Sequence, residues 1–267
     1  MFRDITLGQY YPGNSIIHRL DPRTKLLWTV VYIVTLFLSD NKYSYLACVL
    51  ALGIMIFISK VPIGHMIKGL KAVLIILIIS ILFNLFLTEG DKLFSFWIFT
   101  ITRQGVRRAV FMALRLICLI LGTSLMTFTT TPNQLTDGIE RGLGFLKVIK
   151  VPVHEIAMMM SIALRFIPLL TEELDKIIKA QTARGADIET GNFIKKAKAM
   201  IPMLIPLFVS AFRRAGELAS AMEARCYHGG KGRTRMYPLK YGASDYCFMA
   251  AMFAYLAGII ILKVFLQ

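Results

Sequence analysis

Several long apolar runs constrain the fold of this chain more than any other feature of its sequence. A transmembrane helix needs about 20 mostly apolar residues, and runs approaching this length cover residues 25–38, 43–59, 72–87, 106–128 and 245–262. The mean hydropathy of the 267 residues is +0.63, and 56% of them are hydrophobic. This composition excludes an ordinary soluble enzyme. The sequence predicts an all-α integral membrane protein with about five to six membrane-associated helical spans.

The segments that flank these runs carry start and turn signals. Asp21 followed by Pro22 indicates a helix start, because the carboxylate can cap the first turn and proline suits the first helical position. Ser244 is expected to cap the last span in the same way. Residues 93–105 are aromatic and rich in β-forming residues, which indicates either a short hairpin or an interfacial piece.

Basic residues dominate the charge of the chain. Lys and Arg number 31 against 16 Asp and Glu, so the formal net charge is +15. Combined with apolar spans, this excess indicates basic cytoplasmic surfaces, and we expect a lipid bilayer and no nucleic acid as a partner. Lys60, Lys68 and Lys71 are predicted to lie in a cytoplasmic loop. The arginines from Arg103 to Arg108 fall on the predicted outer side, against the positive-inside tendency.

The pattern of the chain changes after residue 128, where charges begin to recur every few residues. We therefore divide it into N-terminal transmembrane helices over 1–128, a cytoplasmic or interfacial domain of amphipathic helices over 129–243, and a C-terminal transmembrane helix over 244–267. The stretch 151–170 is apolar enough to be buried or to cross the membrane. A basic loop is expected over 228–242.

Two long amphipathic helices are predicted in the middle part, one running through 151–187 without a break and the other through 193–227. Gly191 is expected to separate them. Pro202 and Pro206 should kink the second helix or break it in two.

No catalytic residue, metal site or cofactor is expected. His154 and Glu155 begin a zinc-protease-like HExxH pattern, but Met158 occupies the position of the second histidine. A phosphate-binding loop of the GxxxxGK[ST] type is missing, so the chain has no such route to ATP hydrolysis and is not expected to be an enzyme. The four cysteines show no paired spacing: Cys48, Cys118, Cys226 and Cys247.

Two short motifs, QTARG with Arg184 and MEARC with Arg225, end the two long amphipathic segments. Small neighbours leave each guanidinium accessible, and its planar fork suits a carboxylate-lined pocket on a partner. The alternative is that both arginines only stabilise helix C-termini through the macrodipole. Two such motifs ending successive helices favour a two-pronged contact with a two-fold symmetric partner.

Small residues predict where the long helices approach each other. Ala211, Ala215 and Ala219 recur every four residues, which lets helix backbones pack closely. The plainer alternative is that alanine is a common helix former. We expect the segments 170–187 and 193–227 to cross near these alanines, which would hold the two arginine-bearing ends apart.

Three stretches, HRLDPRTKLL, SIALRFIPLLTEELDKIIKAQTARGAD and AMEARCY, resemble the transmembrane (T) component of energy-coupling factor transporters, called EcfT and related to CbiQ of cobalt uptake systems. The resemblance extends from about residue 15 to 228. It implies that two cytoplasmic ABC-type ATPases contact two coupling helices, and that a small membrane protein, the S component, captures a vitamin or metal ion.

The same resemblance implies the residues of the ATPase contacts. They would be Ala183, Arg184 and Gly185 on the first coupling helix, and Ala224, Arg225 and Cys226 on the second. Cys226 departs from the family pattern, which has glycine there. Because glycine adopts positive φ without steric cost and cysteine does not, this departure bears on the backbone after Arg225.

The leading hypothesis is a non-enzymatic scaffold and transducer of an ATP-driven importer, in the cell membrane of a prokaryote. The ATP would be hydrolysed by partner subunits, and the S component would select the substrate. The alternative is an autonomous secondary permease or channel. That alternative would need polar sites within the membrane, for which Arg115 is the main candidate.

Overall fold

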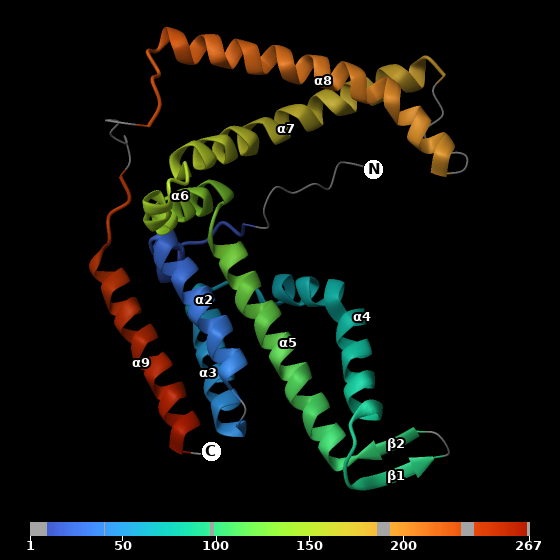
Figure 1. Ribbon diagram of the computed structural model, residues 1–267, viewed down its shortest axis with the longest axis vertical. Helices are drawn as coiled ribbons and strands as arrows, with labels where there is room; N and C mark the ends of the chain where they lie inside the picture. Colours follow the sequence, from blue (N-terminus) through green and yellow to red (C-terminus); the bar gives the residue numbers. More distant parts are fainter. Residues whose placement is uncertain (1–9, 40, 97–98, 186–192, 231–237, 266–267) are drawn as a thin grey trace. The chain divides into compact units, whose positions relative to one another are not determined.

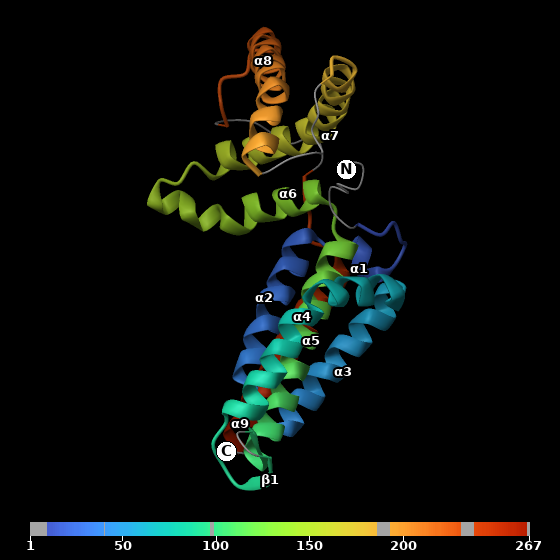
Figure 2. The same cartoon turned by 90° about the vertical axis from the view of Figure 1, so that its right-hand side faces the viewer.

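The computed structural model describes residues 10–39, 41–96, 99–185, 193–230 and 238–265 (Figures 1 and 2). The described chain forms two compact units. The bundle unit comprises the described parts of Gly8–Gly138 and Leu239–Gln267, and the long-helix unit comprises those of Ile139–Pro238. The bundle unit thus draws on both predicted membrane segments, 1–128 and 244–267. Helices make up almost all of both units, which confirms the all-α membrane fold.

The bundle unit consists of the short helix α1 and five longer helices: α1 Ile16–Arg19, α2 Pro22–Leu38, α3 Lys42–Ser59, α4 Ile63–Leu87, α5 Arg103–Thr129 and α9 Ala243–Phe265. Figures 1 and 2 show α2, α3, α5 and α9 side by side, with α4 packed along α5. Between α4 and α5, strands β1 Lys92–Phe96 and β2 Phe99–Thr102 pair antiparallel, with an irregularity between Lys92 and Phe94. The hairpin alternative for residues 93–105 is therefore confirmed.

Local signals set the starts of the helices, with one correction. Pro22 occupies the first position of α2, and the carboxylate of Asp21 accepts the backbone N–H of Arg23, as predicted. The prediction that Ser244 caps the last helix was wrong. Asp245 instead accepts the backbone N–H of Gly242 at 2.8 Å, so a carboxylate in the first turn reaches back to the helix start.

The core of the bundle unit lies between α2, α3, α5 and α9. Trp28 stacks on Tyr32 with ring centroids 5.0 Å apart, and Leu36 is fully buried one turn further on. Met252 and Ile259 of α9 complete the same cluster. The outward faces are also apolar, with exposed side chains such as Val30, Phe37, Leu50, Ile54, Phe57, Ile75, Ile79, Phe253 and Ile260. Apolar surface on both sides of the helices fits a bundle surrounded by lipid.

Four helices of the described chain, α3, α5, α9 and α7 (Val153–Ala183), are long and apolar enough to cross a membrane. Helix α4 counts as a fifth if its two halves form one span, since it bends by 63° between Lys71 and Val73. At 17 residues, α2 has about the minimum length for a span. The prediction that Lys68 and Lys71 lie in a loop was wrong, because both residues lie in the first half of α4.

The boundary between the two units falls within helix α6 (Pro132–Gly142), after Gly138. The long-helix unit continues with the 3-10 turn η1 (Leu143–Ile149), α7 and α8 (Phe193–Ala224). Helix α7 is continuous over 31 residues, as predicted. Helix α8 also stays one helix, with Pro202 and Pro206 inside it, and Figure 1 shows it changing direction in its N-terminal part. The predicted break at Gly191 and residues 231–237 of the predicted loop over 228–242 lie outside the described residues.

Candidate functional site

Helix α7 ends at the first arginine motif. Arg184 is the C-cap residue, and its backbone N–H bonds to the carbonyls of Ala180 and Gln181 at 3.3 and 3.1 Å. Gly185 follows in the left-handed conformation with φ 85°, and its N–H bonds to the Thr182 carbonyl at 3.0 Å. Left-handed backbone at this position ends the helix and satisfies carbonyls that would otherwise lack partners.

Helix α8 ends in the same way at the second motif. Cys226 has φ 55°, and its N–H bonds to the Glu223 carbonyl at 2.8 Å. The next N–H, of Tyr227, returns to the Met222 carbonyl at 3.0 Å, which completes a Schellman motif. Cysteine thus holds the backbone conformation that Gly185 holds on α7. Cysteine in place of glycine therefore raises the conformational energy of the end of α8, although its backbone follows a path similar to that at the end of α7.

Both motifs are open to solvent. All six residues predicted to contact the ATPases are exposed in the structure: Ala183, Arg184, Gly185, Ala224, Arg225 and Cys226. Each arginine therefore projects from a helix end whose flanking residues are small, an arrangement that lets a partner's surface reach the guanidinium.

The structure holds the two arginines far apart. Helices α7 and α8 run antiparallel: Gln181 donates to the Pro202 carbonyl at 3.5 Å, and Arg214 forms an ion pair with Glu173 at 3.2 Å. Arg225 lines a groove together with Met158, near the start of α7. From residue 158 to residue 184, α7 rises about 39 Å. Figure 1 shows the C-terminal ends of the two helices pointing in opposite directions.

Helix α8 turns an unexpected face toward α7. The buried and half-buried residues Met203, Leu207, Ser210, Arg214 and Leu218 follow one another at helical spacing on this face. The helical period of 193–227 predicts an apolar stripe that runs from Ile201 to Met222. Its part toward the start of α8 is largely exposed, whereas Leu218 and Met222 of the same stripe are half-buried. The exposed members are Ile201, Leu204, Ile205, Phe208 and Phe212.

The three alanines do not share one environment. Ala211 is half-buried, whereas Ala215 and Ala219 are exposed. In the chain by itself, the α7–α8 contact therefore depends on longer side chains such as Met203 and Arg214. A close helix approach at the alanines stays a prediction.

The structure also brings together residues that the sequence pattern did not single out as a group. Arg165, Arg214 and Arg225 line a groove of about 680 Å³ between α7 and α8, with Glu217 beside them and Phe166 on its apolar side. The sequence pattern could not identify this groove, because the residues that form its two walls are about 50 positions apart along the chain.

The HRLDPRTK stretch forms a buried polar network within the bundle unit. The Asp21 N–H donates to Asp245 Oδ1 at 2.8 Å, and Arg23 pairs with the Asp21 carboxylate at 2.9 Å. Lys25 Nζ donates to the carbonyls of His18 and Thr129 at 3.1 and 2.9 Å. These contacts fix the start of α2 against the start of α9 and the end of α5, so the stretch has a clear structural role.

Arg115, the main candidate for a polar site within the membrane, also has a structural role. Its Nε donates to the Tyr45 hydroxyl at 2.9 Å, and its Nη2 donates to the Ser39 carbonyl at 3.2 Å. Ser39 is the C-cap residue of α2, so the guanidinium satisfies the end of that helix.

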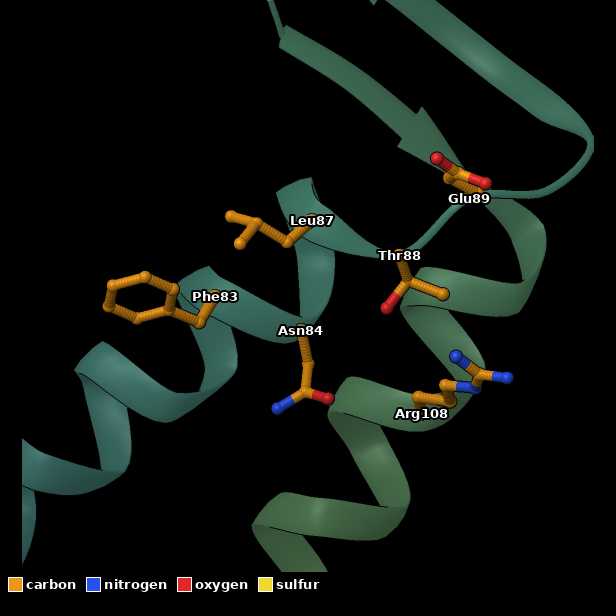
Figure 3. A pocket seen from close by; sticks show the side chains of 6 residues that line it. All are labelled: Phe83, Asn84, Leu87, Thr88, Glu89 and Arg108. Atoms are coloured by element: carbon orange, nitrogen blue, oxygen red, sulfur yellow. The ribbon is translucent and has the colours of Figure 1, made fainter.

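A small hollow of about 560 Å³ lies where α4 ends and α5 begins (Figure 3). Asn84 and Thr88 line it from the α4 side and Arg108 from α5, while Phe83 and Leu87 point away from Arg108. Glu89 lies beside the hollow, so acidic as well as basic groups occupy this end of the bundle. The arginines on the predicted outer side therefore do not form a purely basic surface.

Known proteins share the sequence over nearly its full length. The CbiQ family model, described as "Cobalt transport protein", matches residues 13–236. The energy-coupling factor transporter transmembrane protein EcfT of Ruminiclostridium cellulolyticum is 50% identical over 263 residues, 98% of each chain. The protein of the same name from Clostridium kluyveri is 54% identical over 92% of each chain. That from Bacillus subtilis is 46% identical over 92% of this chain and 93% of its own.

Proposed function

Because this chain belongs to the CbiQ family of transport proteins, we propose that it links two cytoplasmic ATPases to a substrate-binding S component in an energy-coupling factor importer. The chain itself is a multi-pass cell-membrane protein of a prokaryote and a membrane component of a transporter. The role of the two arginines and the identity of both kinds of partner belong to the proposal.

The matched helix ends of α7 and α8 carry the proposal. Each exposes one arginine beside a left-handed residue, and the antiparallel pairing of the helices places the two arginines near opposite ends of α7. A packed pair of helices with two similar, distant ends suits two equivalent pockets on two subunits. Motion of either ATPase would then move the whole helix pair, in the manner of a shear between packed elements.

The exposed stripe of α8 supports a contact with the S component. Phe208 and Phe212 are 60% and 75% exposed, and Ile205 is 60% exposed next to them. A continuous apolar stripe on a helix usually marks an interaction surface. We assign this stripe to the S component because the arginine ends are assigned to the ATPases.

Alanine substitution of Arg184 and Arg225 tests the ATPase contacts. Truncating one partner of a buried, hydrogen-bonded charge pair costs about 2–5 kcal/mol. Each single variant should therefore retain less than about a tenth of the wild-type affinity for the co-expressed ATPases, measured by co-purification, and substrate uptake should fall in parallel. Lysine at either position should restore binding only in part, since an ammonium cannot form the guanidinium's paired hydrogen bonds.

Arg213→Ala provides the matched control, because Arg213 is an exposed arginine of α8 that lies away from the helix end. It should leave both co-purification and uptake near wild-type values. Undiminished ATPase binding and uptake in the Arg184→Ala, Arg225→Ala double variant would refute the assignment.

A further inference from the structure

The groove between α7 and α8 is lined by both apolar and basic side chains. One part is apolar, with Ile162, Phe166 and Leu218, and the other is basic, with Arg165, Arg214 and Arg225. Its volume of about 680 Å³ is that of a small-molecule site. The occupant that fits is therefore both anionic and apolar.

The charges in the groove are only partly balanced within the described chain. Arg214 pairs with Glu173 at 3.2 Å, and Glu217 is the one carboxylate in the lining. Neither Arg165 nor Arg225 forms an ion pair with any residue that the structure describes. The lining therefore holds three arginines and one carboxylate, a positive excess that suits an anionic occupant.

We propose that this groove binds an anionic phospholipid. The phosphate lies against Arg165 and Arg214, and the upper part of one acyl chain lies along Ile162, Phe166 and Leu218. A free phosphate would leave the apolar part of the groove uncovered, whereas a phospholipid covers both parts and is always present around a membrane protein. Basic pockets between helices of membrane proteins bind lipid head groups by the same physics. The phosphate contacts proposed here are Arg165 and Arg214, so they can be tested separately from the ATPase contact assigned to Arg225.

Lipid titration of the purified full chain in a non-ionic detergent tests the proposal. Native mass spectrometry would count bound dioleoylphosphatidylglycerol and, in parallel, dioleoylphosphatidylcholine. The anionic lipid should bind at least about fivefold more tightly, and Arg165→Gln or Arg214→Gln should each weaken its binding about fivefold. Arg213→Gln, next to the groove in sequence but not in its lining, should change nothing.

Arg165→Gln remains informative if Arg214→Gln impairs folding, because Arg165 is exposed and forms no ion pair within the described chain. Phe166→Ser separates a lipid site from a simple anion site, since it should weaken lipid binding without affecting glycerol 3-phosphate. Three results would overturn the proposal: equal binding of both lipids, full competition by glycerol 3-phosphate, or an Arg165→Gln variant that retains lipid but loses ATPase co-purification. The last result would identify the groove as a protein-docking site.

Discussion

Cys226 holds a backbone conformation that glycine adopts at much lower cost. Its φ of 55° lies in the left-handed region, where Cβ approaches the following carbonyl oxygen, and such strain costs a non-glycine residue about 1–2 kcal/mol. The Schellman bonds of Cys226 and Tyr227 to the last turn of α8 hold it there. Gly185 makes the equivalent turn on α7 without this strain. The two arginine-bearing ends therefore differ in stability although their backbones are similar.

Cys226→Gly should stabilise the end of α8. Relief of the left-handed strain exceeds the added flexibility of glycine in the unfolded chain, which leaves a net gain of about 0.5–1 kcal/mol. Hydrogen exchange at the amides of residues 226 and 227 should slow accordingly. Cys247→Gly, at an exposed helical position of α9, is the control and should lower stability. Faster exchange at the end of α8 in Cys226→Gly would contradict the role assigned to the left-handed turn.

Helices α2 and α5 are in close contact where Gly122 of α5 meets the ring of Tyr32. A Cβ atom added at Gly122 of α5 would lie 2.5 Å from Tyr32 Cε1, too close for any side chain. Tyr32 cannot easily yield, because it is 1% exposed and stacks on Trp28. The contact between α2 and α5 at this point therefore requires a residue without a side chain at position 122.

Gly122→Ala should destabilise the bundle unit by about 1–3 kcal/mol, the usual cost of overpacking. Thermal unfolding of the purified protein in detergent would report the change. Gly53→Ala is the matched substitution within α3, where an added Cβ meets nothing within 4 Å. Because alanine favours a helix over glycine by about 0.5–1 kcal/mol, this control should be neutral or stabilising. Equal effects of the two substitutions would rule out the close approach.

The carboxylate of Asp245 connects the start of α9 with the start of α2 in the bundle unit. Asp245 is 5% exposed and accepts the N–H groups of Asp21 and Gly242, both at 2.8 Å. The first of these bonds joins residues 224 positions apart. The start of α9 is thereby fixed to the start of α2, and the last helix becomes part of the core formed by the first ones.

Asp245→Ala should lower the free energy of unfolding by about 2–4 kcal/mol, since two N–H groups lose a charged acceptor. Limited proteolysis should also cut more readily between the long-helix unit and α9. Asp91→Ala removes an exposed carboxylate that pairs with Gln104, and it should cost less than about 1 kcal/mol. An equal loss of stability in both variants would show that the buried contacts of Asp245 stabilise the protein no more than the exposed contact of Asp91.

The sequence alone determined the features that depend on neighbouring residues. The start of α2 follows from Asp21 and Pro22, the continuity of α7 from its unbroken helical periodicity, and the ends of α7 and α8 from the positions of their arginine motifs. The membrane class follows from the length of the apolar runs. These signals act within one or two helical turns, so a single sequence contains them in full.

Only the tertiary structure decided which helix faces meet. Periodicity identified the apolar stripe of α8 but could not identify its neighbour, and α7 packs on the face with Ser210 and Arg214 instead. The groove with Arg165, the pairing of Asp245 with Asp21, and the bend in α4 likewise depend on packing between elements. Contacts between residues distant in sequence leave no local pattern, because each partner's own segment is compatible with several neighbours and the packing of the whole chain selects among them.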